Sequence, residues 1–116
     1  MLKLDCCFIT DSGKIRTNNE DNFFICGTYK RTPEELRYRK KDFVYRGGIF
    51  AVCDGMGGEE FGEKASLISV EELNNFKEKD FNEYHEKYFD MVNSRICDLR
   101  FENNGVKSGT TMHLYI

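Results

Sequence analysis

The sequence has no apolar stretch long enough to cross a membrane. Its longest, residues 49–53, is far shorter than the ~20 residues that span a bilayer. The amino terminus also lacks the apolar segment of a secretory signal, because Lys3 and Asp5 interrupt it. We therefore expect no membrane partner and a cytoplasmic location.

The chain also has no excess of positive charge. It contains 17 Lys plus Arg against 20 Asp plus Glu, which gives a formal net charge of −3. No overall positive field draws such a chain to nucleic acid or to acidic lipid, so we expect no nucleic-acid partner. Six basic residues lie between positions 30 and 41, and we expect them on a solvated surface. Any phosphate site must therefore be local.

Several common metal and phosphate motifs are missing. The five cysteines are odd in number and never spaced as C-x-x-C, which favours reduced, mostly buried thiols over a zinc site or disulfides. The glycines after Asp54 do not complete G-x-G-x-x-G, because Glu60 occupies the last glycine position, and there is no G-K-[ST] loop or calcium loop. His85 and His113 lack partners at catalytic spacing, so we expect both to be structural. The cysteines are Cys6, Cys7, Cys26, Cys53 and Cys97.

The residues that are present predict one small α+β domain. With 116 residues, 40% of them hydrophobic and 14% aromatic, the chain can bury a single core. Apolar alternation or continuous apolar runs predict strands at 2–9, 23–26, 49–53 and 108–116. The third strand is expected to be covered on both faces and to end at Asp54, since its apolar run is continuous.

Helical spacing predicts two helices between the third and fourth strands. The first covers residues 62–76, and the second carries a buried stripe at i, i+4 and i+7 spacing. Stripe residues are Tyr84, Tyr88, Met91, Val92, Ile96 and Leu99. A short surface helix is also predicted at 32–41, because Thr32 is a suitable cap and Pro33 suits a first helical position. The predicted order is βββααβ, with that small helix in addition.

Acidic residues gather at the edges of two predicted strands. Glu20 and Asp21 come just before the second strand, and Asp54 and Gly55 come just after the third. A carboxylate beside a buried strand is held on a stiff element, and a glycine lets a backbone carbonyl approach a ligand closely. Mg²⁺ and Mn²⁺ prefer such oxygen ligands, so these residues are candidates for a hard cation. Each cluster taken alone also fits ordinary turn chemistry.

Four segments form an ordered set of motifs. They are residues 10–23 (TDSGKIRTNNEDNF), 50–58 (FAVCDGMGG), 62–66 (GEKAS) and 108–111 (SGTT). Together they resemble the first four motifs of the bacterial PPM-type (type 2C) metal-dependent protein phosphatases. The resemblance covers essentially all of residues 1–116, and it implies the N-terminal portion of that family's domain, since the family's domain runs well beyond this length.

The resemblance implies a Ser/Thr phosphatase that hydrolyses phosphoprotein phosphomonoesters with a water activated by two Mn²⁺ or Mg²⁺ ions. Arg16 matches the family's phosphate-clamping arginine, and Asp54 matches the acid that bridges both metals. Glu20 and the Gly55 carbonyl match ligands of the second metal, and Asp21 matches an acid that acts directly or through water. The implied fold is a partial β-sandwich of antiparallel strands with two helices on one face.

Two departures from the family pattern limit this expectation. Eukaryotic members often have a histidine acid at the position of Met56. Bacterial members commonly have methionine there, so this chain has no such histidine. The chain also ends before the family's C-terminal metal-binding aspartates, so we expect at most one weakly held ion, and self-association through an exposed sheet edge. The later carboxylates are expected on solvated faces and offer no replacement. They are Glu71, Glu72, Glu78, Asp80, Glu83, Glu86, Asp90, Asp98 and Glu102.

Two other functions stay open on the sequence. One is a phosphate-binding or partner-binding module that keeps Arg16 and part of the acidic site without turnover. The other is a small α+β domain whose acidic residues are only turns. Metal stoichiometry separates these from an enzyme, because a complete two-metal site binds two ions and a binding module binds at most one.

Overall fold

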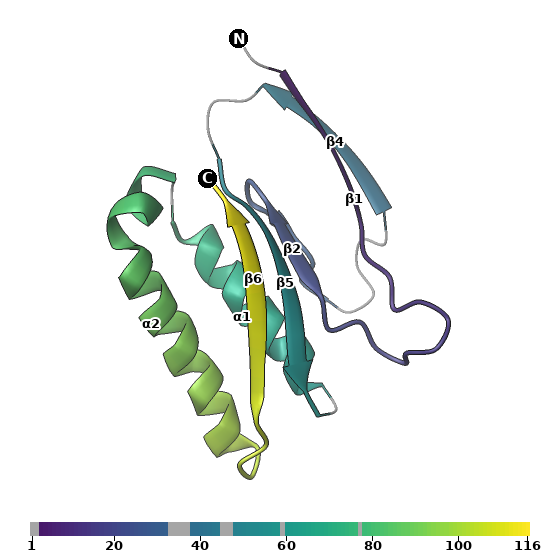
Figure 1. Ribbon diagram of the computed structural model, residues 1–116, viewed down its shortest axis with the longest axis vertical. Helices are drawn as coiled ribbons and strands as arrows, with labels where there is room; N and C mark the ends of the chain where they lie inside the picture. The colour runs from purple at the N-terminus through teal and green to yellow at the C-terminus, as the bar shows by residue number, and fades with distance from the viewer. Residues whose placement is uncertain (1–2, 33–37, 45–47, 59, 77) are drawn as a thin grey trace.

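A four-stranded antiparallel sheet, in the order β3-β2-β5-β6, forms the centre of the fold (Figure 1). The computed structural model describes residues 3–32, 38–44, 48–58, 60–76 and 78–116. The sheet consists of β2 (Asn22–Ile25), β3 (Thr28–Tyr29), β5 (Phe50–Gly57) and β6 (Ser108–Tyr115). Strands β2, β5 and β6 confirm three of the predicted strands, so the expected α+β class is correct.

A second, two-stranded sheet pairs β1 (Lys3–Ile9) with β4 (Tyr38–Val44). The predicted N-terminal strand is confirmed, whereas β3 and β4 were not predicted. Residues 33–37 of the expected surface helix lie outside the described residues, and residues 38–41 belong to β4, so a helix there was wrong. Pairing over seven residues of β1 supplies backbone hydrogen bonds that outweigh the local helix signals.

The turn between β2 and β3 occupies two residues with left-handed backbone. Cys26 has φ of 45° and Gly27 has φ of 94°, while Ile25 and Thr28 pair on either side. Two positive φ angles in a two-residue loop are typical of a type I′ turn, whose twist matches that of the flanking strands. This tight turn fixes the position of the residue that follows β3, Lys30.

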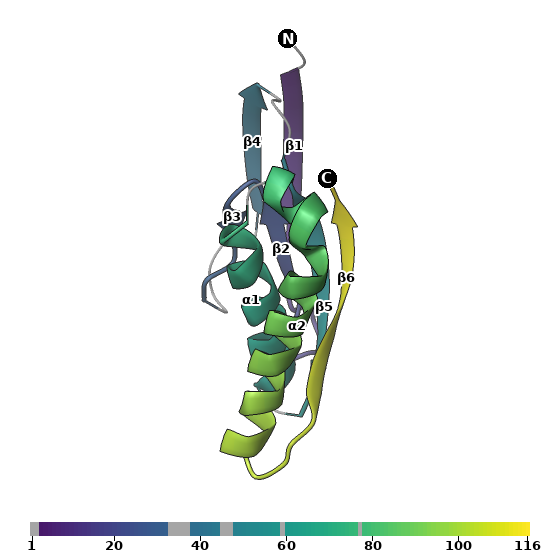
Figure 2. The same ribbon diagram turned by 90° about the vertical axis from the view of Figure 1, so that its left-hand side faces the viewer.

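Helices α1 (Phe61–Asn74) and α2 (Glu78–Glu102) cover one face of the sheet (Figure 2). Side chains of β5 therefore alternate: Ala51 and Cys53 are buried beneath the helices, whereas Val52 and Asp54 face away from them. The expectation that this strand is covered on both faces was wrong among the described residues, since Val52 is 57% exposed. The strand also continues past Asp54, because its pairing with β6 extends to Gly57.

The core between the helices and the sheet centres on Tyr88 of α2, which has no exposed surface. Its ring meets those of Phe76 and Phe81 edge to face, and its hydroxyl donates a hydrogen bond to the Ser69 carbonyl oxygen at 2.8 Å. The predicted stripe is confirmed at Tyr88 and Val92, which are buried, and at Ile96 and Leu99, which pack partly buried against the core, whereas Met91 is 37% exposed. Tyr84 is instead 47% exposed, because the backbone there is not helical (φ −120°, ψ 25°).

Two further expectations about buried residues need correction. Of the five cysteines, all of which are described and none of which forms a disulfide, only Cys53 is buried; Cys7 and Cys97 are exposed. Glu72 is only 6% exposed rather than solvated, because Arg95 donates hydrogen bonds to it at 2.7 Å and to Glu71 at 3.0 Å.

No helix in the described part of the chain is long and apolar enough to cross a membrane.

The position of Tyr88 gives a first test of the fold. Tyr88→Ala should lower the free energy of unfolding by about 3–5 kcal/mol, because it removes a fully buried aromatic ring and leaves a cavity. Phe101→Ala, at a side chain that is 85% exposed, should change it by less than about 0.5 kcal/mol. Urea unfolding followed by circular dichroism measures both. Equal effects would contradict the described packing of α2.

Candidate functional site

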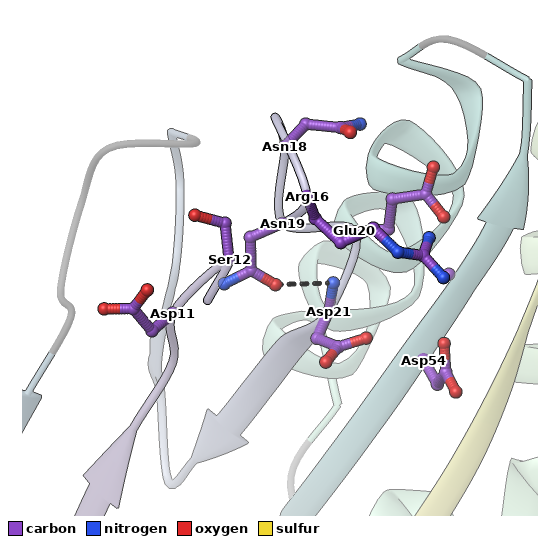
Figure 3. Close-up of a pocket in the computed structure, with 9 residues that line it drawn as sticks. Asp11, Ser12, Arg16, Asn18, Asn19, Glu20, Asp21 and Asp54 are labelled. Carbon is purple, nitrogen blue, oxygen red and sulfur yellow. Dashed lines mark hydrogen bonds between the residues drawn. The ribbon is translucent and has the colours of Figure 1, made fainter. Parts of the chain in front are cut away.

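All five site residues predicted from the sequence line one pocket of about 270 Å³ (Figure 3). The pocket lies where the loop before β2 meets β5, on the side of the sheet that the helices leave uncovered. Residues that line it are Asp11, Ser12, Arg16, Asn18, Asn19, Glu20, Asp21, Asp54 and Gly55. The fold therefore gathers residues from two segments that lie more than thirty positions apart in the chain.

Asp21 and Asp54 stand side by side in the pocket. Asn22 pairs with Cys53 in the β2–β5 ladder, so the residues next to them, Asp21 and Asp54, meet at the end of that ladder. Figure 3 shows both carboxylates on the same side of the loop. Burial raises the pKa of the Asp21 carboxyl above its ordinary value, and the charge of Asp54 and a hydrogen bond with it raise that pKa further. A shared proton or a bound cation would relieve this crowding.

Glu20 is fixed through its backbone and lies against the start of α1. Its carbonyl oxygen accepts a hydrogen bond from the Ser66 hydroxyl at 2.6 Å. Its carboxylate lies over Gly62, where a Cβ would come within 2.8 Å of Oε2. The first turn of a helix favours a negative charge, so this position suits a carboxylate. The carboxylate of Glu20 therefore lies beside α1 as well as beside the pocket.

Gly55 is required because three backbone segments cross at this point. A Cβ on Gly55 would come within 2.6 Å of the Glu20 carbonyl oxygen, and it would also clash with the carbonyl oxygen of Gly62. A side chain on Gly62 would likewise meet the Glu20 carboxylate. Only residues without a Cβ allow β5, α1 and the loop before β2 to approach so closely.

Arg16 reaches the pocket from an exposed loop. Figure 3 shows its guanidinium group on the same side as the carboxylates of Glu20 and Asp54. The carboxylate of Asp11 points away from that group and accepts a hydrogen bond from the Gly13 backbone N–H at 2.9 Å. A guanidinium group offers a planar fork of donors that fits a phosphoryl group, so the positive charge needed for a local phosphate site is present.

The loop that carries Glu20 and Asp21 is held mainly through Asn19. The Asn19 side-chain amide donates to the Thr10 hydroxyl at 2.6 Å, and its oxygen accepts the Asp21 N–H at 3.1 Å. The Asn19 carbonyl oxygen accepts a hydrogen bond from Nζ of Lys30 at 3.0 Å. Together these contacts tie the loop to Thr10 and to Lys30.

The sequence did not identify Lys30 or Ser66 as part of this arrangement. Lys30 was expected on a solvated surface with the other basic residues, and it is 2% exposed. Ser66 belongs to a recognised motif, but nothing in the sequence showed that its hydroxyl would reach Glu20. The short hairpin of β2 and β3 brings Lys30 back beside β2, where the Asn22 side chain binds its backbone, and no local pattern in the sequence indicated this contact.

The oxygen donors at the pocket are of the kind that a hard cation prefers. Asp21 and Asp54 are adjacent, whereas the Glu20 carboxylate lies toward Gly62. In the described ranges of the chain, no three His, Cys, Asp or Glu side chains converge to form a metal site. Among the described acidic side chains of the pocket, the carboxylates of Asp21 and Asp54 are therefore a close pair rather than a larger cluster.

The backbone crossing predicts a large difference between two strand glycines. Gly55→Ala should lower the free energy of unfolding by about 1–3 kcal/mol or more, because the new Cβ meets backbone atoms that cannot move independently. Gly109→Ala, on the neighbouring strand β6, has no atom within 4 Å of the new Cβ and should have little effect. Thermal unfolding of the two variants compares them directly. A Gly55→Ala chain as stable as Gly109→Ala would overturn the crossing.

The crowding of Asp21 and Asp54 predicts that stability depends on pH. Because the pKa of Asp21 is raised in the folded chain, the folded state binds a proton more readily than the unfolded state, and stability falls as the pH rises through that window. Asp21→Asn should therefore raise Tm at pH 7 in EDTA, and the gain should vanish below the ordinary pKa of 3.8.

Asp98→Asn, at an exposed position on α2, is the matched control and should leave Tm unchanged at both pH values. A Tm at pH 7 that Asp21→Asn fails to raise would contradict the crowding of the two carboxylates.

Comparison with known proteins found no matching family model, no matching curated protein and no matching solved structure. The resemblance to the PPM-type phosphatases therefore depends on the four sequence motifs. Residues from the first two of these segments line one pocket, and Ser66 of the third donates a hydrogen bond to the Glu20 carbonyl oxygen.

Proposed function

We propose that this chain is the N-terminal portion of a PPM-type protein Ser/Thr phosphatase domain and that the pocket is its metal and phosphate site. The single observation that carries the proposal is the gathering of Arg16, Glu20, Asp21, Asp54 and Gly55 around one pocket. A cation site and a guanidinium group side by side are two elements that can bind a phosphomonoester and stabilise the charge that develops during its hydrolysis. Crowding of the two carboxylates of Asp21 and Asp54 is not required by turn chemistry and favours a binding role.

Each residue has a role that follows from its position. Asp54 on the stiff strand β5 and the adjacent Asp21 would hold Mn²⁺ or Mg²⁺, with Glu20 and the Gly55 carbonyl close by. Arg16 would bind the phosphoryl oxygens and orient them toward the carboxylates. A bound ion would supply a more acidic water and would neutralise charge on the phosphoryl group. The described residues supply donors for one weakly held ion.

The proposal extends to the surroundings of the site. We propose that the four-stranded sheet is part of a β-sandwich, since Phe8 of β1 packs against Phe23 on the face opposite the helices, while Val52 and Met56 on that face are more than half exposed. Strand β6 stands at the edge of the sheet, where unpaired backbone groups favour self-association. The expected substrate is a phosphoprotein that carries phosphoserine or phosphothreonine. A cytoplasmic location suits five cysteines that form no disulfide.

A second candidate is a phosphate-binding or partner-binding module without turnover. It is favoured by the finding that no three metal-binding side chains converge within the described ranges. Arg16 and the pocket would then recognise a phosphoryl group that is bound and released unchanged. This candidate needs neither two metal ions nor an activated water.

Hydrolysis of p-nitrophenyl phosphate by the purified chain, with and without Mn²⁺, tests the proposal. We expect turnover that depends on Mn²⁺ and falls by more than about 100-fold in Asp54→Asn, because the substitution removes a metal ligand. Asp98→Asn, an exposed position on α2, should retain the wild-type rate.

Mn²⁺ and phosphate binding, measured by calorimetry on the same samples, separate the two candidates. Phosphate binding that requires Arg16, without turnover in a folded sample, would replace the phosphatase by the binding module. Absence of both metal and phosphate binding would contradict both and would leave only structural turns.

A further inference from the structure

Lys30 is a buried cation beside the acidic pocket. Only 2% of its surface is exposed, although it immediately follows a short edge strand. A lysine is almost never buried unless its ammonium group finds partners, because removing a charge from water is costly. Its Nζ donates a hydrogen bond to the Asn19 carbonyl oxygen at 3.0 Å. The side chain therefore points toward the loop that carries Glu20 and Asp21.

The backbone of Lys30 is also fixed by hydrogen bonds. The Asn22 side-chain amide donates to the Lys30 carbonyl oxygen at 2.8 Å, and its oxygen accepts the Lys30 N–H at 3.0 Å. Lys30 thus contacts Asn22 through its backbone and Asn19 through its side chain. These two asparagines bracket Glu20 and Asp21 in the sequence. One residue therefore anchors both ends of the segment that brings two carboxylates to the pocket.

The electrostatic surroundings of Lys30 are acidic. Burial lowers the pKa of its ammonium group, while the charges of Glu63 and Asp21 raise it. Glu63, in the first turn of α1, has a buried oxygen, Oε1, without a hydrogen-bond partner. Burial raises the pKa of Glu63, and the charge of Lys30 opposes that shift. The ammonium group of Lys30 therefore lies near carboxylates of both the loop before β2 and α1.

We propose that Lys30 is a positioning residue that holds the segment 19–22 in the shape required for the pocket. It does not touch the metal or the phosphoryl group; it acts through Asn19, whose side chain accepts the Asp21 N–H. The metal-binding part of this inference rests on the proposed function, whereas the ordering of the segment does not.

Charge and position make opposite predictions for loss of Lys30. If its charge alone mattered, its removal would reduce repulsion of a bound cation, and Mn²⁺ affinity would rise. If its role is to position Asp21, removal would spread the carboxylates over several arrangements, and affinity would fall. The sign of the change therefore identifies the role.

The experiment compares Lys30→Met with Lys64→Met. Methionine preserves most of the volume and removes the charge and the donor. Lys64 is a matched control, because it lies in the first part of α1, acts on Glu63 as Lys30 does, and is solvent-exposed. We expect Lys30→Met to weaken Mn²⁺ binding by about tenfold, the size of effect typical of residues that orient metal ligands. Lys64→Met should leave the affinity unchanged or raise it.

Hydrogen exchange of the Asp21 amide provides a readout that needs no metal. Its exchange should become about tenfold faster in Lys30→Met and stay unchanged in Lys64→Met. In wild type the segment can open only by breaking the hydrogen bond between Lys30 and Asn19, and Lys30→Met lacks that bond. Equal exchange in the two variants, or Mn²⁺ affinity that Lys30→Met preserves or raises, would overturn the inference. A wild-type chain that binds no Mn²⁺ would contradict the proposed metal site, and the exchange rates alone would then decide the role of Lys30.

A wild-type measurement covers the case in which Lys30→Met does not fold. Nitrogen-detected NMR of the lysine ammonium groups should show a signal for Lys30 that survives exchange with water, and none for Lys64, since only the former is buried and bonded to a carbonyl. Rapid exchange at Lys30 would overturn the inference.

Discussion

The close crossing of β5 over the start of α1 is the constraint on which the site depends. Gly55 and Gly62 approach so closely that neither has room for a Cβ, and the backbone of Glu20 lies against the same point. Three segments that are separate in the sequence therefore share one small region. The contacts that pack α1 against the sheet also position the acidic residues of the pocket. The pocket and the fold therefore depend on the same interactions.

Such a crossing encloses polar backbone groups, and the surrounding side chains satisfy them. Ser66 donates to the Glu20 carbonyl oxygen, Lys30 donates to that of Asn19, and Asn22 satisfies both backbone groups of Lys30. An unpaired buried polar group costs about 1–3 kcal/mol, so each of these contacts stabilises the loop by avoiding that cost. The adjacent carboxylates of Asp21 and Asp54, in contrast, repel each other and destabilise the folded chain. Repulsion between two adjacent carboxylates in a well-ordered region is frequent at functional sites.

The two faces of the sheet differ in what they contact: one packs against the helices and the other carries Asp54 of the pocket. Alternate residues of β5 either enter the core beneath α1 and α2 or point toward the face opposite the helices. Asp54 lies on that second face, where solvent and a ligand can reach it, while its neighbour Cys53 is fully buried. The strand thus fixes a carboxylate through the packing of the opposite face, which is how a rigid element positions a reactive group.

Local patterns in the sequence were enough to predict the helices, four of the six strands and the five candidate site residues. These depend on interactions between residues near in sequence: alternation along β1, helical spacing in α1, and acids and glycines at strand ends. Strand β4 could not be predicted, because its hydrogen bonds are made to β1, whose paired residues lie 29 to 41 positions away in the chain.

Tertiary structure alone decided that Asp21 and Asp54 would be neighbours, that Tyr84 would leave the core and that Lys30 would be buried. Lys30 is buried because Asn19 and Asn22 contact it. The run of basic residues in the sequence would look the same if these contacts did not form, so it could not predict the burial. The sequence by itself determined which chemical groups were available and on which elements they lie. Only the fold decided which of them meet, since the distances between them depend on long-range packing rather than on their order along the chain.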